Sequence, residues 1–315
     1  MYYPYFRGKQ YDLIAIRECA ALMAKKGFVP IIEPVKESIN ALTRTLQTLE
    51  DNKCHSVLIV NPQNGGHSND PSSISELITD TLASHSNIRI GVILNKDITA
   101  QKALEIALEH NGRTITFIHA GFNTPSILAS QLISDDNDHY EHVFLEDYCG
   151  KLYRKHFRSP QSNRVLIRDG FKKRANREHP DVESFSDLHA TFEEEGMNGF
   201  GDFLIVGDNY SESGGPAYAV AIHITYIDHE RDDEMYIHHF KSDRNDTPTD
   251  PGGKFAEALR KLVNEVESPN TKILKTDAIK EFQALHKNGH FPGLGSVKKI
   301  SMKHHVETIA NYFHD

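Results

Sequence analysis

A short apolar run that ends in a polar residue recurs along the first two thirds of the chain. Residues 28–34 (FVPIIEP) show the pattern, because Glu33 and a proline follow a stretch of apolar side chains. Runs of this length, rich in Val, Ile and Phe and apolar on both faces, are typical of buried parallel strands. The other runs lie at residues 1–8, 55–62, 89–95, 114–121, 141–147, 164–170 and 201–208.

Segments with helical spacing of apolar residues separate these runs. Strands that alternate with helices form βαβ units, and eight such units predict a closed (β/α)8 barrel of TIM type. Because this fold takes about 250 residues, we expect a single domain over residues 1–315. The expected helices of the barrel cover residues 11–26, 38–51, 100–110, 125–133, 152–157 and 185–196, and one more begins near Ser72.

The pattern changes after the eighth run. Residues 218–226 and 235–240 are two β-rich stretches around a charged turn, which predicts a β-hairpin insertion over residues 209–249. A C-terminal helical extension is expected over residues 270–315. Helical patterns in this part of the chain cover residues 250–266, 277–287 and 303–313.

The expected hairpin carries several histidines. If its strands pair symmetrically, His223 and His238 lie opposite each other. Two interpretations are open, because such a pair is either a set of metal ligands or part of a solvated sheet face. Neighbouring His238 and His239 would point to opposite faces of the sheet, since side chains alternate along a strand.

Charge and cysteine content limit the class of protein. The formal net charge of -9 argues against broad electrostatic binding to a nucleic-acid backbone, which needs a basic face. Three cysteines form no disulfide framework and suit a reducing compartment. No apolar run reaches the roughly 18 residues of a membrane helix, and the N-terminus lacks a signal-peptide core. These features predict a cytoplasmic protein that is not bound to a membrane.

Polar residues at the ends of the runs are the candidates for catalysis. In a closed barrel the carboxyl ends of the strands surround one mouth, so residues far apart in the sequence converge there. Carboxylates and a histidine in such a place suit acid–base chemistry, while caps and structural ion pairs are the alternative. The catalytic candidates are Glu33, His119, Asp147 and Asp169.

A metal is a further option for the same mouth. Glu33, Asp147 and Asp169 offer hard oxygen ligands of the kind that Mg²⁺ and Mn²⁺ prefer. The sequence contains no close-spaced motif of metal ligands, so it does not determine whether the protein binds a metal cofactor.

Basic and glycine-rich segments are candidates for binding an anion. Barrels often bind phosphate with the loops after strands seven and eight and with a helix N-terminus. Gly252-Gly253-Lys254 opens the helix after the eighth run, but Phe255 stands where a P-loop has Ser or Thr. An exposed loop and a plain helix start are the alternatives. The expected ligand-binding residues are Arg7, Lys9, Asn61, Arg168, Lys172, Gly252, Gly253 and Lys254.

Several stretches are similar to a known group of proteins. Residues 3–10 (YPYFRGKQ), residues 30–34 (PIIEP), the run from Gly201 to His223 and residues 250–255 (DPGGKF) resemble the "beta protein"-like families of bacteria and phages. The subfamily that the chain resembles is usually encoded beside a small companion protein, in neighbourhoods suggestive of phage defence. The resemblance implies bacterial origin and a protein partner, and it assigns no catalytic residue.

Two functions are compatible with these features. The first is a barrel enzyme that hydrolyses a phosphate-containing small molecule, nucleotide or nucleic-acid end with carboxylates and His119. The second is a non-catalytic recognition or scaffold subunit whose companion protein carries the chemistry.

Overall fold

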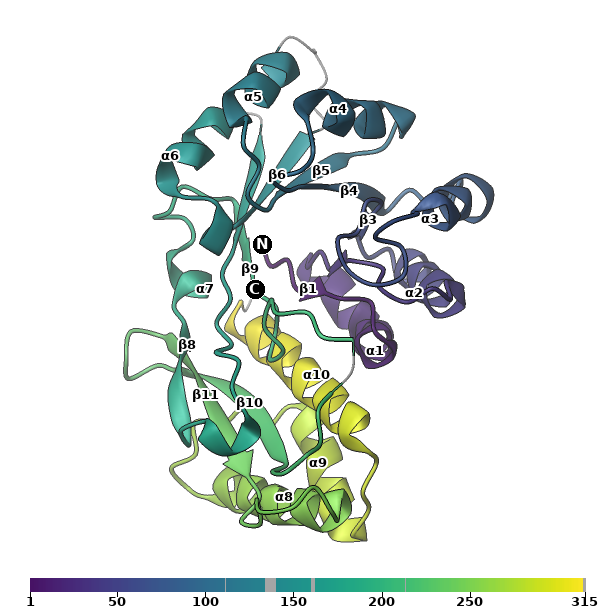
Figure 1. The fold of residues 1–315 in the computed structure, drawn as a ribbon. Helices are drawn as coiled ribbons and strands as arrows, with labels where there is room; N and C mark the ends of the chain where they lie inside the picture. Colours follow the sequence, from purple (N-terminus) through teal and green to yellow (C-terminus); the bar gives the residue numbers. More distant parts are fainter. Residues whose placement is uncertain (111, 134–139, 160–161, 213, 314–315) are drawn as a thin grey trace. The chain divides into compact units, whose positions relative to one another are not determined.

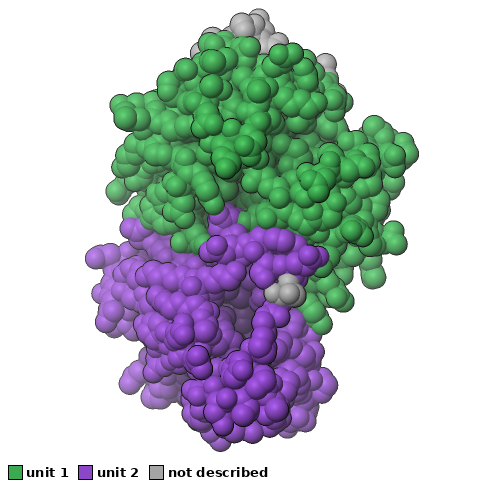
Figure 2. All heavy atoms as spheres, viewed as in Figure 1, with its two compact units in different colours: residues 1–169, 191–202 green, residues 170–190, 203–315 purple. Residues whose placement is uncertain are grey.

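The chain forms two compact units, which Figure 2 colours separately. A computed structural model describes residues 1–110, 112–133, 140–159, 162–212 and 214–313. Unit 1 consists of residues 1–169 and 191–202, and unit 2 consists of residues 170–190 and 203–315. Each unit has its own sheet.

Unit 1 is built on an eight-stranded parallel sheet with the order β1-β2-β3-β4-β5-β6-β7-β9. The backbone N–H of Tyr3 donates to the Phe200 carbonyl (2.8 Å), and Tyr2 forms a parallel bridge to Phe200, so the last strand lies beside the first. The sheet is therefore nearly closed and barrel-shaped, with helices flanking it (Figure 1). This confirms the barrel-like α/β fold expected from the apolar runs. The strands are β1 (Tyr5–Phe6), β2 (Ile31–Ile32), β3 (Ser56–Ile59), β4 (Ile88–Leu94), β5 (Ile115–His119), β6 (Tyr140–Leu145), β7 (Asn163–Ile167) and β9 (Gly199–Gly201).

The eighth barrel strand differs from the expectation. A strand was expected over residues 201–208, but β9 ends at Gly201, and Leu204 has a φ of 51° that no strand adopts. The apolar residues Phe203 and Ile205 are buried in a turn instead. Strand β9 needs glycine, because a Cβ at Gly201 would overlap the carbonyl oxygen of Tyr3. The hydrophobic pattern placed this strand too late in the sequence, because the position of β9 depends on the close contact between Gly201 and Tyr3 and not on apolar side chains.

The helices of unit 1 end and begin at recognisable signals. Helix α1 ends at Gly27, whose left-handed φ of 65° lets its N–H donate to the Ala24 carbonyl. Thr99 caps α4 by accepting a hydrogen bond from the Lys102 backbone N–H (3.2 Å). The helices are α1 (Gln10–Lys26), α2 (Asn40–Asp51), α3 (Ser72–Glu76), the π-helical η1 (Leu77–Thr81), α4 (Ala100–Glu109), α5 (Pro125–Ile133), η2 (Glu146–Tyr148), α6 (Lys151–Arg154) and η3 (Lys155–Phe157).

Unit 2 contains a three-stranded antiparallel sheet with the order β10-β11-β8. Strands β10 (Ala221–Asp228) and β11 (Glu234–Lys241) form a hairpin, and β8 (Val182–Ser186) pairs with the outer side of β11. The helix expected over residues 185–196 is wrong in its first part, because Phe185 lies in β8 and only α7 (Leu188–Thr191) is α-helical there. The other helices are η4 (Asn176–Glu178), α8 (Pro251–Glu267), α9 (Asp277–Asn288) and α10 (Leu294–Tyr312).

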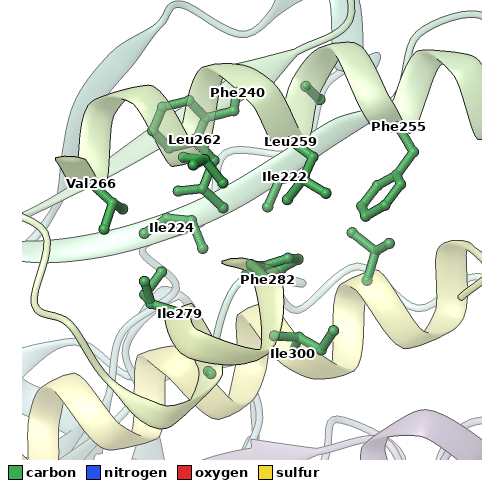
Figure 3. Packing of buried hydrophobic residues seen from close by; sticks show 14 of the residues in the cluster. Ile222, Ile224, Phe240, Phe255, Leu259, Leu262, Val266, Ile279, Phe282 and Ile300 are labelled. Carbon is green, nitrogen blue, oxygen red and sulfur yellow. The ribbon is translucent and has the colours of Figure 1, made fainter. Parts of the chain in front are cut away.

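The core of unit 2 lies between one face of this sheet and the helices. Ile222 and Ile224, two residues apart on β10, point to the same face as Phe240 and pack against α8 and α9 (Figure 3). Phe255 and Leu262 contribute from the buried stripe of α8. Side chains at the intervening positions of β10 and β11 point to the opposite face, and two of them are the histidines His223 and His239.

No helix among the described residues combines the length and the apolar character that crossing a membrane requires.

Candidate functional site at the carboxyl ends of the barrel strands

Polar side chains follow the carboxyl ends of the strands of unit 1. Because all eight strands run in the same direction, these ends share one end of the barrel-shaped sheet, which is where barrel enzymes hold their active sites. Arg7 follows β1, Glu33 follows β2, Asn61 follows β3, Glu146 follows β6, and Arg168 and Asp169 follow β7.

Glu33 is the most enclosed of these residues. Its side chain is fully buried, and Oε2 accepts hydrogen bonds from the Tyr5 hydroxyl (2.9 Å) and from the Arg7 guanidinium. Oε1 accepts from the backbone N–H groups of Gln63 (3.0 Å) and Asn64 (3.1 Å) and from the Asn64 side-chain amide. Both carboxylate oxygens are thus fully engaged, and Glu33 holds Arg7 and the loop after β3 together.

The Arg7–Glu33 contact depends on a tight turn. Gly8 has a φ of 61°, and a Cβ at this position would lie 2.7 Å from the backbone oxygen of Glu33. Only glycine accepts both the left-handed backbone and this close approach. The Arg-Gly pair that the sequence shows after β1 is therefore explained by the packing of the turn against β2.

Arg168 and Glu146 form a second ion pair on neighbouring strands. Arg168 Nε lies 2.5 Å from Glu146 Oε2, and its NH2 group lies 3.1 Å from Oε1, which is the two-pronged geometry that Arg and carboxylate favour. Both side chains keep just over a quarter of their surface exposed. Unlike Glu33, this pair can therefore exchange contacts with a ligand from solvent.

Asn61 continues the pairing of two strands. Its side-chain amide donates to the Ile93 carbonyl (2.9 Å), and its oxygen accepts from the Ile93 N–H (2.8 Å). The side chain thus replaces a backbone partner between the end of β3 and β4, so both of its polar groups are used within the sheet.

His119 lies in an aromatic cluster beneath α6 and η3. Its Nδ1 shares a hydrogen bond with the Tyr153 hydroxyl (2.7 Å), its Nε2 shares one with His142 Nδ1 (3.0 Å), and its ring stacks on Phe144. Burial, with the neighbouring His142, lowers the pKa of His119 well below its ordinary value. Its contacts with Tyr153 and Phe157 place the ring on the helix-covered side of the sheet.

The remaining candidates of unit 1 are dispersed. Asp147 is exposed in the 3-10 turn η2, while Asp169 is partly buried at the end of the first segment of unit 1. Lys9 precedes α1, and its backbone N–H points to Asp12 Oδ2 at 3.4 Å. Among the residues that the structure describes, the carboxylates proposed for Mg²⁺ or Mn²⁺ do not come together within the spacing of metal ligands.

The other expected anion-binding residues belong to unit 2. Lys172 is exposed and lies 3.6 Å from Glu183. The Gly253 N–H at the start of α8 donates to the Asp250 side chain (2.9 Å), so a carboxylate of the protein already caps this helix. Lys254 is buried, and its amino group donates to the carbonyls of Ala217, Tyr218 and Thr247.

A polar network inside unit 1 was missed by the sequence interpretation. Arg89 donates to both oxygens of Glu141 (2.8 and 2.9 Å), and Thr116 and Asn163 also bond to this carboxylate. Tyr3 completes the network through its hydroxyl. Arg89, Thr116, Glu141 and Asn163 lie at or near the beginnings of their strands, and Tyr3 precedes β1, so a search for polar residues at strand ends does not find them.

No protein family matches the chain, and a comparison with curated proteins likewise finds no match.

Proposed function

We propose that unit 1 is a barrel enzyme that hydrolyses a phosphate-containing small molecule, a nucleotide or a nucleic-acid end. The observation that carries the proposal is the Arg168–Glu146 pair, which is partly exposed at the carboxyl ends of two adjacent parallel strands. Catalytic groups of barrel enzymes come from such positions. The net charge of -9 argues against a long nucleic-acid backbone as the ligand, because such a backbone needs a broad basic face, whereas a compact anion needs only a local one.

The proposal gives the polar residues at the carboxyl ends of the strands distinct roles. Arg168 binds the phosphate with its planar guanidinium, which matches two oxygens of a phosphate as it does those of a carboxylate. When the anion takes over Arg168, Glu146 is released as a general base for the attacking water, with Asp169 beside Arg168 in the chain as its alternative. Glu33 holds Arg7 and the β3 loop in place, and His119 supports the strands from within the aromatic cluster.

Small molecules that co-purify with the native protein test this proposal directly. We expect native mass spectrometry to detect a bound phosphate-containing anion in the wild type, and its loss in Arg168→Gln. The matched control is Arg44→Gln, which removes an exposed arginine of α2. Phosphatase and phosphodiesterase assays on the same proteins should show activity that Glu146→Gln lowers by about 10²-fold or more, the range of a general base. Unchanged anion content and activity in both Arg168→Gln and Glu146→Gln would exclude the roles assigned to these two residues.

A second function is favoured by a different observation. Glu33 and Lys254 have their polar atoms engaged inside the protein, as expected for a chain whose charged residues serve structure. Under this alternative the chain is a recognition or scaffold subunit for a companion protein, and the resemblance to the "beta protein"-like families supports a role in phage defence. Co-expression with a small companion protein of the kind that the resemblance implies separates the two functions. Stable complex formation by an Arg168→Gln, Glu146→Gln double variant that still protects cells from phage would favour the subunit.

A further inference from the structure

Three histidines of unit 2 converge on the face of the sheet that is turned away from α8. His179 precedes β8, His223 lies on β10, and His239 lies opposite His223 on β11. One ring nitrogen of each lies within 4.8 Å of the others, and this is the one such cluster among the residues that the structure describes. The hairpin register therefore pairs His223 with His239, and the expected pairing of His223 with His238 is wrong by one residue, because Ile224 faces His238.

We propose that His179, His223 and His239 bind a single divalent transition-metal ion, with Zn²⁺ the best match. Imidazole nitrogens are ligands for zinc, copper, nickel and cobalt, whereas Mg²⁺ and Ca²⁺ require oxygen. Three histidines leave one tetrahedral position for water or a further ligand. The site lies wholly within unit 2 and does not depend on the function proposed for the barrel.

The distance between His223 and His239 fits an ion after a small adjustment. His223 Nδ1 and His239 Nδ1 lie 2.7 Å apart, so two lone pairs would face each other unless a proton lies between them. Zinc bound to nitrogen at about 2.0–2.1 Å holds tetrahedral ligands about 3.3 Å apart. An ion can thus take the place of the proton if the two rings separate by a few tenths of an ångström.

A second observation points to a ligand at the same place. His179 is 2% exposed, and its Nε2 is buried without a hydrogen-bond partner. Buried polar atoms are nearly always paired, and an exception requires an explanation. The ring of His179 stacks on His239 with centroids 4.2 Å apart and lies edge-on to His223 at 5.2 Å, so the orphaned nitrogen belongs to a ring of the same cluster.

Glu183 positions the cluster from β8. Its Oε1 lies 3.2 Å from His239 Nε2, the nitrogen that does not face His223, and the carboxylate is held in turn by Arg174 at 2.5 and 3.0 Å. Histidine ligands commonly donate their second N–H to a carboxylate, which fixes the ring and strengthens the metal-facing nitrogen. Glu183 is thus a positioning residue and Arg174 keeps it in place.

The electrostatic surroundings are compatible with metal binding. Burial, together with His179, lowers the pKa of His239 to about 4, and burial also lowers the pKa of His179 and His223. Burial alone would raise the pKa of Glu183, but Arg174, His239 and Lys172 together outweigh it and bring this pKa to about 2. Burial thus disfavours a positive charge on each of the three rings, while its basic neighbours favour the ionised form of the Glu183 carboxylate.

A purely structural cluster is the competing explanation. Phe171 packs edge-on against His223 at 5.1 Å, so stacked rings alone could fill this face of the sheet. The two explanations differ in what they predict for added metal. A packing cluster gains nothing from an ion, whereas a ligand set binds one with defined stoichiometry and geometry.

Metal titration of the full chain tests the proposal. After treatment with a chelator, the wild type should take up one Zn²⁺ per chain in calorimetry and elemental analysis. Cobalt in its place should give the intense visible bands of tetrahedral Co²⁺. His179→Phe, His223→Phe and His239→Phe, which keep an aromatic ring in the stack, should each weaken zinc binding by at least 100-fold. Glu183→Gln should weaken it by about 10–100-fold, the usual effect of a supporting carboxylate.

The matched control is His238→Phe. This histidine adjoins His239 but stacks on Phe240 on the other face of the sheet, so its loss should leave zinc stoichiometry and affinity unchanged. Circular dichroism of each variant separates lost ligands from lost folding. The proposal is overturned if the wild type binds no ion, or if folded variants of the three histidines bind zinc as tightly as His238→Phe does.

Discussion

At the scale of single residues, the buried Arg7–Glu33 pair shows how charge is used in this chain. Glu33 has no exposed surface, and five donors surround its carboxylate. Removing one partner of a buried pair leaves the other charge uncompensated. A side chain that looks catalytic in the sequence is thus held in place by the fold, and its first effect when changed is on stability.

Glu33→Ala should lower the free energy of unfolding by about 3–5 kcal/mol, because Arg7 and the loop N–H groups lose their acceptor. Urea denaturation at neutral pH measures this effect. Asp147→Ala is the control, because Asp147 is exposed, and it should change stability by less than about 0.5 kcal/mol. Equal, small effects in both variants would contradict the structural role of Glu33.

The buried His119–His142 pair should make stability depend on pH. Burial, with Arg164 nearby, lowers the pKa of His142 from 6.5 to about 3, and the pKa of His119 is lowered too. An unfolded histidine takes up a proton below about pH 6.5. The contribution of the pair is therefore complete above pH 6.5 and is lost as the pH falls toward 3.

Below pH 6.5, the free energy of unfolding should fall by about 1.4 kcal/mol per pH unit for each buried histidine that stays neutral. His142→Phe should reduce this slope, since Phe fills the same stack beside Phe144 and Phe157 without titrating. Thermal or urea unfolding between pH 4 and 7 measures the slopes. The exposed His55→Phe is the control, and a His142→Phe slope equal to that of the wild type would exclude the mechanism.

Lys254 gives a residue-scale test of the expected phosphate site. Its amino group is buried against three backbone carbonyls at the start of α8. Lys254→Met should destabilise unit 2 by about 1–3 kcal/mol or more by leaving these carbonyls without a donor. Lys280→Met on the exposed side of α9 is the control. If Lys254→Met is as stable as the wild type and instead loses a bound anion, this result would support the anion-binding role that the sequence predicts for Gly252-Gly253-Lys254.

At the scale of elements, the sequence identified those strands that are apolar on both faces. Runs such as those around Ile90 and Val165 lie on β4 and β7, because burial on both sides leaves few polar residues inside them. The sequence did not predict β9 correctly, because its Gly-Phe-Gly segment depends on close contact with Tyr3, and a hydrophobic pattern does not show such a contact. The sequence did not predict β8, because this strand pairs with β11, which lies far away in the sequence.

The candidate sites show the same limit. The end of a strand marks a polar residue as a candidate, but it does not say whether that residue meets solvent, as Arg168 does, or a buried partner, as Glu33 does. The histidine cluster needs the hairpin register and a loop brought in from residue 179. Neither can be deduced from spacing, since a shift of one residue reverses which face a side chain occupies.

Closure of the sheet by β9 can be tested at one position. A Cβ at Gly201 would overlap the Tyr3 carbonyl oxygen, so Gly201→Ala must push β9 away from the first strand. We expect a loss of about 1–3 kcal/mol or more, as for overpacking elsewhere, with a lower melting temperature. Gly150→Ala is the matched control, because a Cβ there meets nothing within 4 Å. Equal stability of the two variants would show that β9 does not close against the first strand.

At the scale of the whole molecule, separate cores in the two units predict separate responses to ligands. The core around Phe255 and Phe282 belongs to unit 2, while Val57, Ile90 and Val165 belong to the barrel. A ligand that binds only the folded form of one unit stabilises that unit by mass action. Zinc bound by the histidine cluster should therefore raise the unfolding temperature of unit 2 and leave that of unit 1 unchanged.

Calorimetry of the full chain with and without Zn²⁺ measures this difference, and the variants assign the transitions. Gly201→Ala should lower the transition that zinc does not move, and Lys254→Met should lower the transition that zinc raises. His223→Phe should abolish the zinc shift while both transitions remain. A zinc shift that follows the Gly201→Ala transition would contradict a site in unit 2. A single transition lowered by both variants would show that the two cores unfold together, since independent cores respond to changes within themselves alone.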